Sequence, residues 1–206
     1  MSKSYHHGDL RRALIEKTLE LVQADQVHLV GFRELARQLA VSRSAPYRHF
    51  SNVEDLLAEV ARQGFAAFID VLEPVATLKG YTPEERFLEL GVTYVHFALE
   101  HSAHYRLMFD CAYFKQEDFP EVQGLAAHAF TLLKYTSSAC MDKSASDRDK
   151  LELATMAWAF VHGLSKLFID GQLAKIKNRK RFIRSSCQRF VRRLTTTMKQ
   201  GVAGSD

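Results

Sequence analysis

A short run of polar and basic side chains lies at residues 43–49. Arg43 can donate two hydrogen bonds to the edge of a guanine. Beside it, Ser44 and Ala45 can lie against base edges or a thymine methyl group. The remaining members of the run suit phosphate oxygens: Tyr47, Arg48 and His49. We therefore expect residues 43–49 to contact DNA.

Further candidate DNA contacts lie near the N-terminus. Lys3 and Tyr5 precede the first expected helix, and a short arm of this kind can reach phosphates or the minor groove. Residues 1–50 hold eight Lys or Arg, five acids and four His. The net charge of +4 for the whole chain is weak evidence by itself, because many proteins that bind no polyanion are mildly basic. The alternative interpretation is a solvated basic surface.

Apolar residues at helical spacing surround this run. They predict a first helix over residues 9–24, which Asp9 can cap, and a second helix over 32–40. A third helix is expected over 43–50, and it must pack on the other two because it is too short to be stable alone. Three such helices, with a polar outer face on the third, predict a helix-turn-helix head over residues 1–52.

The rest of the chain, residues 53–206, shows the same helical spacing. A capping box at Ser51 and Glu54 is expected to begin a long helix. Further helices are expected at about 82–101, 104–109, 120–141, 148–170 and 177–199. Strand signals are nearly absent, so the sequence predicts an all-α fold of about nine helices in two domains.

Composition excludes several classes of protein. Among 206 residues there are only 4 Pro and 10 Gly against 47% apolar residues, which argues against disorder. No run of 18 apolar residues occurs and the N-terminus is polar, so neither a membrane span nor a signal peptide is expected. Cys111, Cys140 and Cys187 are widely spaced and predict neither a disulfide framework nor a zinc site. We expect a cytoplasmic protein.

The head resembles that of the TetR family of bacterial regulators in two stretches, residues 4–22 (SYHHGDLRRALIEKTLELV) and 32–50 (FRELARQLAVSRSAPYRHF). The body is similar to one branch of that family, through HYRLMF at 104–109 and WAFVHGL at 158–164, which includes Trp158, His162 and Gly163. The resemblance implies an operator-binding regulator, usually a repressor, with a helical body that binds a small effector and forms a homodimer.

Four positions of the head depart from the family pattern. The family usually has Gly near Gln26, Ser or Thr at Gly31, Gly at Ala40 and Lys at Val53. Gly31 has no side chain to cap a helix or bind a phosphate, and Val53 cannot form the phosphate contact of a lysine. If the turn at Ala40 needs a left-handed residue, that alanine costs roughly 1 kcal/mol. Weaker DNA binding with a flatter salt dependence is expected.

The resemblance places the effector pocket among aromatic and polar side chains of the body. Our candidates are Tyr94, Phe97, Tyr105, Phe109, Trp158 and His162. Such a lining suits a largely apolar or aromatic ligand. The alternative remains open that these side chains are plain core, and that His162 is a buried histidine bonded to a backbone carbonyl.

The resemblance also implies a homodimer through the last two helices, at about 148–170 and 177–199, which would present two heads to a palindromic operator. Residues 171–205 hold ten Lys or Arg and no acid. That segment is either a solvated outer face or a further contact for nucleic acid or an acidic partner.

Catalysis and metal binding find little support. The chain has no glycine-rich phosphate loop, GxSxG, HExxH or pair of catalytic acids, so we expect no enzyme activity, no catalytic residue and no cofactor. His96, His101 and His104 share a helical spacing, but they form no recognised metal-binding motif and no metal site is predicted. The alternative to a ligand-responsive regulator is a helical protein-interaction regulator whose head binds DNA weakly.

Overall fold

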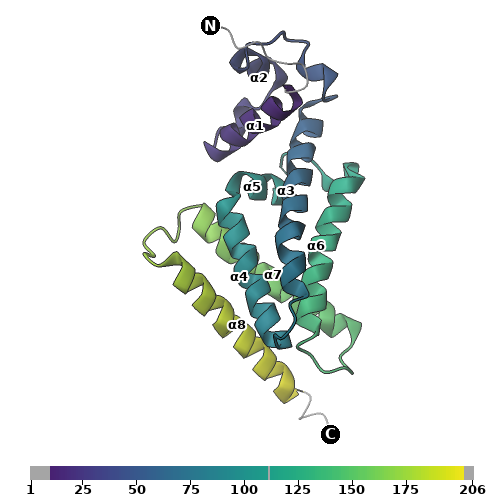
Figure 1. Cartoon of the computed structure of the whole chain (residues 1–206), viewed down its shortest axis with the longest axis vertical. Helices are drawn as coiled ribbons and strands as arrows, with labels where there is room; N and C mark the ends of the chain where they lie inside the picture. Colours follow the sequence, from purple (N-terminus) through teal and green to yellow (C-terminus); the bar gives the residue numbers. More distant parts are fainter. Residues whose placement is uncertain (1–9, 111, 202–206) are drawn as a thin grey trace. The chain divides into compact units, whose positions relative to one another are not determined.

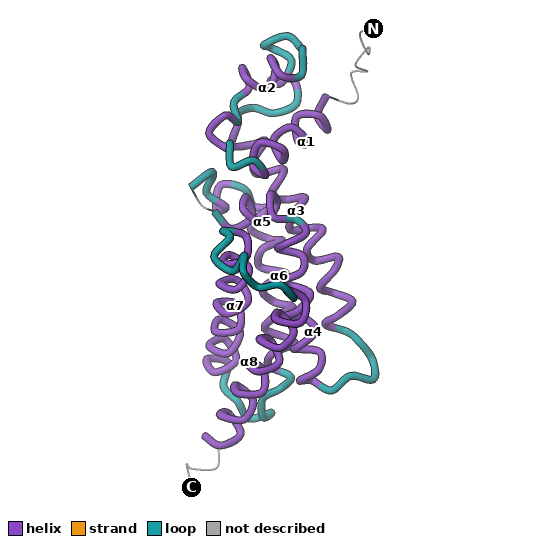
Figure 2. Tube along the Cα trace, turned by 90° about the vertical axis from the view of Figure 1, so that its left-hand side faces the viewer, coloured by secondary structure: helices purple, strands orange, loops and turns teal. Residues whose placement is uncertain are grey.

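The structure, a computed structural model, describes residues 10–110 and 112–201 (Figure 1). In that part of the chain there are eight α-helices, three short 3-10 helices and no strand, which confirms the expected all-α fold (Figure 2). The α-helices are α1 (Leu10–Gln23), α2 (Phe32–Gln38), α3 (Val53–Ala76), α4 (Pro83–Glu100), α5 (Ser102–Phe109), α6 (Pro120–Ser138), α7 (Asp147–Ile169) and α8 (Arg179–Gly201). The 3-10 helices are η1 (Val27–Leu29), η2 (Pro46–Arg48) and η3 (Gln116–Asp118). None of the described helices is both long and apolar enough to cross a membrane.

The chain forms two compact units. Unit 1 contains residues 1–66 and 101–125, and unit 2 contains residues 67–100 and 126–206. Helices α3 and α6 therefore each contribute residues to both units. This division follows packing, and the boundary at residue 52 that the sequence predicts stays a prediction.

Unit 1 begins with the head, in which α1, α2 and η2 pack together. Leu14 and Leu35 are completely buried there, and Phe50 is buried beside them. The apolar spacing that predicts α1 and α2 is thus the spacing of the buried face. These contacts give the head its core.

The third head element differs from its prediction. Instead of a helix over 43–50, the chain forms a turn followed by the 3-10 helix η2. Its hydrogen bonds join residues three apart, from the N–H of Ala45 to the carbonyl of Ser42 (3.0 Å) and from the N–H of Arg48 to the carbonyl of Ala45 (3.2 Å). Pro46 lacks an N–H group, so the α-helical hydrogen bond that residue 46 would donate is missing, although the N–H of Phe50 still reaches the carbonyl of Pro46 (3.1 Å).

The cap of α3 also lies one residue later than predicted. The side chain of Asn52 accepts a hydrogen bond from the N–H of Asp55 (2.7 Å), and the carboxylate of Asp55 accepts one from the N–H of Ser51 (3.0 Å). The predicted pairing of Ser51 with Glu54 is wrong because Asn is an equally good N-cap and has an acid three residues later.

Unit 1 extends beyond the head because α1 also packs against α5. Arg106 of α5 forms an ion pair with Asp25, which follows α1 (3.0 Å), and the hydroxyl of Ser102 donates to the side chain of Gln23 (2.9 Å). These two polar links join residues about 80 positions apart. The head and α5 therefore belong to one packed body.

Unit 2 is a helical bundle in which α4 packs against both α7 and α8 (Figure 1). The expected start of α4 is confirmed, since Thr82 and Glu85 exchange side-chain and backbone hydrogen bonds (2.8 and 3.2 Å). A second capping box, from Ser146 and Asp149, begins α7. Gly171 follows α7 with φ of 75°, as a left-handed cap requires.

Ala40 is exposed and has φ of 53°, so the turn of the head does require a left-handed residue. We predict that Ala40→Gly raises the free energy of unfolding by about 0.5–1 kcal/mol, because removing the strained Cβ outweighs the extra chain entropy of glycine. Urea denaturation measures the change.

The matched control is Ala127→Gly, an exposed alanine inside α6. There the same exchange should lower the free energy of unfolding by about 1 kcal/mol. A loss of stability in both variants would contradict the assignment of strain to Ala40.

Candidate nucleic-acid interface and effector site

The surface around η2 presents hydrogen-bonding groups to solvent. Arg43, Ser44 and Arg48 are exposed, and Tyr47 is 63% exposed. The ring of Tyr47 meets the ring of Phe32 edge to face, with centroids 4.9 Å apart. Phe32 is itself buried, so Tyr47 is held at its base while its hydroxyl remains accessible. Such a surface can donate several hydrogen bonds to a polyanion.

Not every predicted DNA contact lies on that surface. Ala45 is only 9% exposed and supports the turn from inside, so it is not available to a base edge. His49 is half-buried. Lys3 and Tyr5 lie outside the described residues. The exposed part of the predicted set is therefore Arg43, Ser44, Tyr47 and Arg48.

Two of the family departures have visible structural consequences. Gly31 is the N-cap of α2, in extended backbone, and no side chain caps this helix. Nothing lies within 4 Å of the position a Cβ would take there, so serine or threonine would fit. Asp25, next to Gln26, has φ of 60° at the end of α1, where a glycine would be unstrained.

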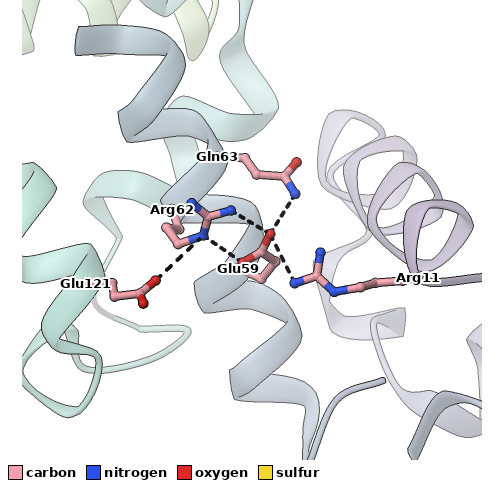
Figure 3. Close-up of polar contacts among 5 residues, drawn as sticks. All are labelled: Arg11, Glu59, Arg62, Gln63 and Glu121. Carbon is pink, nitrogen blue, oxygen red and sulfur yellow. Dashed lines mark hydrogen bonds and ion pairs between the residues drawn. The ribbon is translucent and has the colours of Figure 1, made fainter. Parts of the chain in front are cut away.

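A partly buried ion-pair network lies where α1 meets α3 (Figure 3). Glu59 is 11% exposed and accepts hydrogen bonds from Arg62 (2.8 and 3.0 Å) and Gln63 (2.8 Å) on its own helix. Arg11 of α1 reaches the same carboxylate at 3.2 Å, and its guanidinium also lies 5.2 Å from the centre of the Phe50 ring. On the other side, Arg62 lies 4.0 Å from Glu121 of α6.

Burial by itself would raise the pKa of Glu59. Hydrogen bonds from Arg62 and Gln63, together with the charges of Arg62 and Arg11, outweigh that effect and lower the pKa from 4.5 to about 2. The carboxylate is thus ionised at every pH at which the protein is expected to work. Sequence reasoning missed this network because Arg11 and Glu59 are 48 positions apart and only packing joins them.

An open groove of about 270 Å³ adjoins the network. Its lining comes from α1, the two residues after η2, α3, and the stretch from the end of η3 into α6: Arg11, His49, Phe50, Asp55, Ala58, Glu59, Arg62, Asp118, Phe119, Pro120, Glu121 and Val122. None of the predicted effector contacts lines it. The groove lies within unit 1, next to the DNA-contact candidate His49.

Four of the six predicted effector contacts lie in unit 2. The indole N–H of Trp158 donates to the hydroxyl of Tyr94 (3.2 Å), which lies 3.5 Å from Nδ1 of His162. Phe68 packs against both Tyr94 and Phe97, with ring centroids 4.9 and 4.8 Å apart. Burial and, to a lesser degree, the charge of Lys166 lower the pKa of His162, which favours a neutral imidazole.

The other two predicted contacts lie in unit 1. Tyr105 is 1% exposed and packs against Phe109, with ring centroids 4.8 Å apart. Phe109 also meets Phe65 edge to face at 5.4 Å. Four of the predicted side chains therefore lie in unit 2 and two in unit 1.

The histidines considered as metal ligands also divide. His101 and His104 lie in unit 1 with ring centroids 6.2 Å apart, whereas His96 lies in α4 of unit 2. Burial and the neighbouring His101 lower the pKa of His104. Among residues 10–110 and 112–201, no group of three or more His, Cys, Asp and Glu side chains is arranged to hold a metal ion.

Two sequence profiles match the chain. The profile of bacterial regulatory proteins of the tetR family matches residues 14–60, which include α1, α2, η2 and the start of α3. The profile of the tetracyclin repressor-like C-terminal domain matches residues 87–194, more than half of the chain. The chain belongs to the TetR family. No curated protein matches it by sequence.

Solved structures agree with this TetR-family assignment. A protein of unknown function from Rhodococcus sp. RHA1 is 25% identical, with a TM-score of 0.75 over 96% of this chain and 99% of that one. A TetR/AcrR-family regulator from Thermobifida fusca is 15% identical, with a TM-score of 0.63 over 89% and 96%. The fatty acid degradation regulator FadR from Bacillus halodurans is 13% identical, with a TM-score of 0.64 over 92% and 96%.

TetR-family membership gives the two units their context. The matched head is a DNA-binding helix-turn-helix domain, and the exposed side chains around η2 lie on it. The family and fold are those of transcriptional regulators.

We predict that Glu59→Gln lowers the free energy of unfolding by about 1 kcal/mol at pH 7, because it leaves Arg11 and Arg62 without their shared carboxylate. The depressed pKa stabilises the folded state above pH 4.5, and this contribution is lost as the pH falls toward 2. The difference between wild type and variant should therefore shrink over that range. Thermal unfolding at a series of pH values measures it.

Glu34 provides a matched control, because it bonds Arg37 and Gln38 at the same spacing and its pKa is also about 2. That trio lies on the surface of a single helix, where solvent screens the charges. Glu34→Gln should have a smaller effect than Glu59→Gln. Equal effects would mean that the link from Arg11 to Glu59 contributes nothing to stability.

Proposed function

We propose that this protein is a homodimeric regulator that binds a palindromic operator and is released from it by a small apolar or aromatic effector, acting in the cytoplasm as a repressor. The observation that carries the proposal is the exposed set Arg43, Ser44, Tyr47 and Arg48 on the helix-turn-helix of a TetR-family chain. Arg43 and Ser44 would read base edges, whereas Tyr47 and Arg48 would bind phosphates.

The departures of the head favour a modest affinity. Gly31 contributes neither a cap nor a hydroxyl for a phosphate, and Val53 takes the place of a cation at the start of α3. Each missing phosphate contact lowers the slope of affinity against salt by about 0.9. These positions are the observation behind the second candidate function, a regulator that acts chiefly through a protein partner.

For the effector, we propose the cluster of unit 2. Tyr94 and Phe97 are almost fully buried, whereas Trp158 is 38% exposed and so is accessible from solvent. The linked polar groups of Trp158, Tyr94 and His162 could orient one polar group of a ligand against an aromatic wall. Trp158 is the only tryptophan of the chain, so its fluorescence reports on this site alone.

An effector can release DNA only if it binds the released conformation better than the DNA-bound one. The direct links between α1 and α5 give one route by which a conformational change outside the head would alter the position of α1. Arg106 and Ser102 of α5 bind residues at the end of α1. Movement of α5 would strain or break these contacts.

For the dimer, we propose the exposed faces of α7 and α8. Met156 and Leu167 of α7 are 44% and 46% exposed, and Gly163 lies between them at helical spacing. On α8, Phe182 is 38% exposed. An apolar face of this kind on two neighbouring helices suits an isologous four-helix interface.

The first experiment is a salt titration of binding to the DNA upstream of the protein's own gene. We predict that Arg43→Ala and Tyr47→Ala each weaken sequence-selective binding about tenfold or more, because each removes contacts to a base edge or a phosphate. Arg43→Ala should also relax sequence preference, whereas Tyr47→Ala should weaken binding to all sequences.

Arg33→Ala is the control, since Arg33 is exposed on α2 but outside the predicted reading set. If the wild type and all three variants bind DNA with equal affinity and without sequence preference, operator recognition is rejected. It would favour the second candidate function.

The dimer is tested by Gly163→Glu. Nothing lies within 4 Å of the Cβ position of Gly163, so the chain itself can accept a side chain, but a carboxylate in an apolar interface would be costly. We predict a shift from dimer to monomer in sedimentation experiments and a loss of operator affinity. Gly124→Glu is the control, because Gly124 is an equally open glycine of α6.

Folding of both variants is checked by circular dichroism. If Gly163→Glu sediments as a dimer, like Gly124→Glu, the interface does not lie on this face of α7.

A further inference from the structure

A dense basic segment joins α7 to α8. Within seven residues the chain carries five cations, all exposed: Lys175, Lys177, Arg179, Lys180 and Arg181. No acid occurs from 171 to 205. We call residues 175–181 the basic segment.

The cations of the basic segment lack the partners that other cations of unit 2 have. Arg184, one turn further along α8, binds Glu89 of α4 at 3.1 Å, and Lys166 of α7 lies 3.3 Å from Asp170. By contrast, within the described part of the chain none of the five forms an ion pair. Their charge is therefore not used to hold the fold together.

Their position also opposes helix stability. The positive end of a helix dipole favours acids in the first turn, and α3, α4 and α7 follow this rule. Helix α8 has no acid in its first turn and begins instead with Arg179, Lys180 and Arg181. Only the side chain of Asn178 compensates, by accepting a hydrogen bond from the N–H of Arg181 (3.0 Å). A bound polyanion would relieve this repulsion.

We propose that the basic segment binds the phosphate backbone of nucleic acid without regard to sequence, as a contact separate from the helix-turn-helix. Guanidinium and ammonium groups at this density match the closely spaced phosphates of a duplex. The chain belongs to a family whose head domain binds DNA, so DNA is a polyanion that the basic segment can encounter.

The apolar neighbours of the basic segment favour nucleic acid over a lipid surface. Binding in a membrane interface needs protruding apolar side chains as well as cations. Leu173 and Ile176 are half-buried, and Phe182 packs edge to face against Phe168 with centroids 6.1 Å apart. The five cations extend into solvent, whereas Leu173 and Ile176 are half-buried and Phe182, although 38% exposed, belongs to the proposed dimer interface.

The test uses the full chain and a labelled duplex of scrambled sequence, about 30 base pairs long, with binding measured by fluorescence anisotropy between about 50 and 200 mM salt. The variant replaces four cations by glutamine: Lys175→Gln, Lys177→Gln, Lys180→Gln and Arg181→Gln. Arg179 is retained because it shares a helix face with Phe182, which belongs to the proposed dimer interface. We predict affinity at least tenfold weaker at about 100 mM salt and a salt slope flatter by about 2 or more, since each lost phosphate contact removes about 0.9.

The matched control changes the net charge equally at scattered exposed positions: Lys79→Gln, Lys115→Gln, Lys143→Gln and Arg148→Gln. Its slope should stay within about 0.5 of wild type. Equal losses in the two variants would mean that only total charge matters and would overturn the proposal.

Two further readouts separate the possible partners. If the variant loses binding to vesicles of anionic phosphatidylglycerol while its duplex binding equals wild type, the segment binds lipid and the proposal is overturned. Arg43→Ala, measured on the same scrambled duplex, should retain the steep salt slope, because the basic segment acts independently of sequence reading. Failure of operator recognition would thus leave this result unchanged.

Discussion

Packing beneath η2 is the constraint on which the DNA-contact surface depends. A 3-10 helix of three residues makes too few hydrogen bonds to persist alone, so its position comes from buried Pro46 and Phe50 and from the edge-to-face contact of Tyr47 with Phe32. The same contacts leave Arg43 and the Tyr47 hydroxyl in solvent. Side chains that hold the turn and side chains that we propose as DNA contacts therefore alternate within one short stretch of sequence.

Around that turn, unit 1 is held by polar links between segments distant in the sequence. Glu59 gathers Arg11 and Arg62 beneath the head, and Asp25 binds Arg106 of α5. Because these bonds join the head to α3, α5 and the start of α6, the head is not an independent module on a linker. Movement of α5 or of the start of α6 would change the distances in these charged contacts.

Positive charge has two uses in this chain. Arg11, Arg62 and Arg184 are paired with carboxylates and contribute to the fold. Around η2 and in the basic segment, cations are exposed, and at the start of α8 they oppose the helix dipole. Natural sequences tend to break local rules of this kind where binding requires it. The net charge of the chain does not separate the paired cations from the exposed ones.

The sequence by itself determined the all-α fold and the start of α4, because apolar spacing and helix caps act over a few residues. The structure supplied the positive φ of Ala40 and the Ser146–Asp149 capping box of α7. Tertiary structure alone decided that Ala45 is buried, that the Trp158 indole bonds the Tyr94 hydroxyl, and that Arg11 meets Glu59. These depend on which surfaces of distant segments are buried together. Periodicity shows that a face is apolar, but not what it packs against.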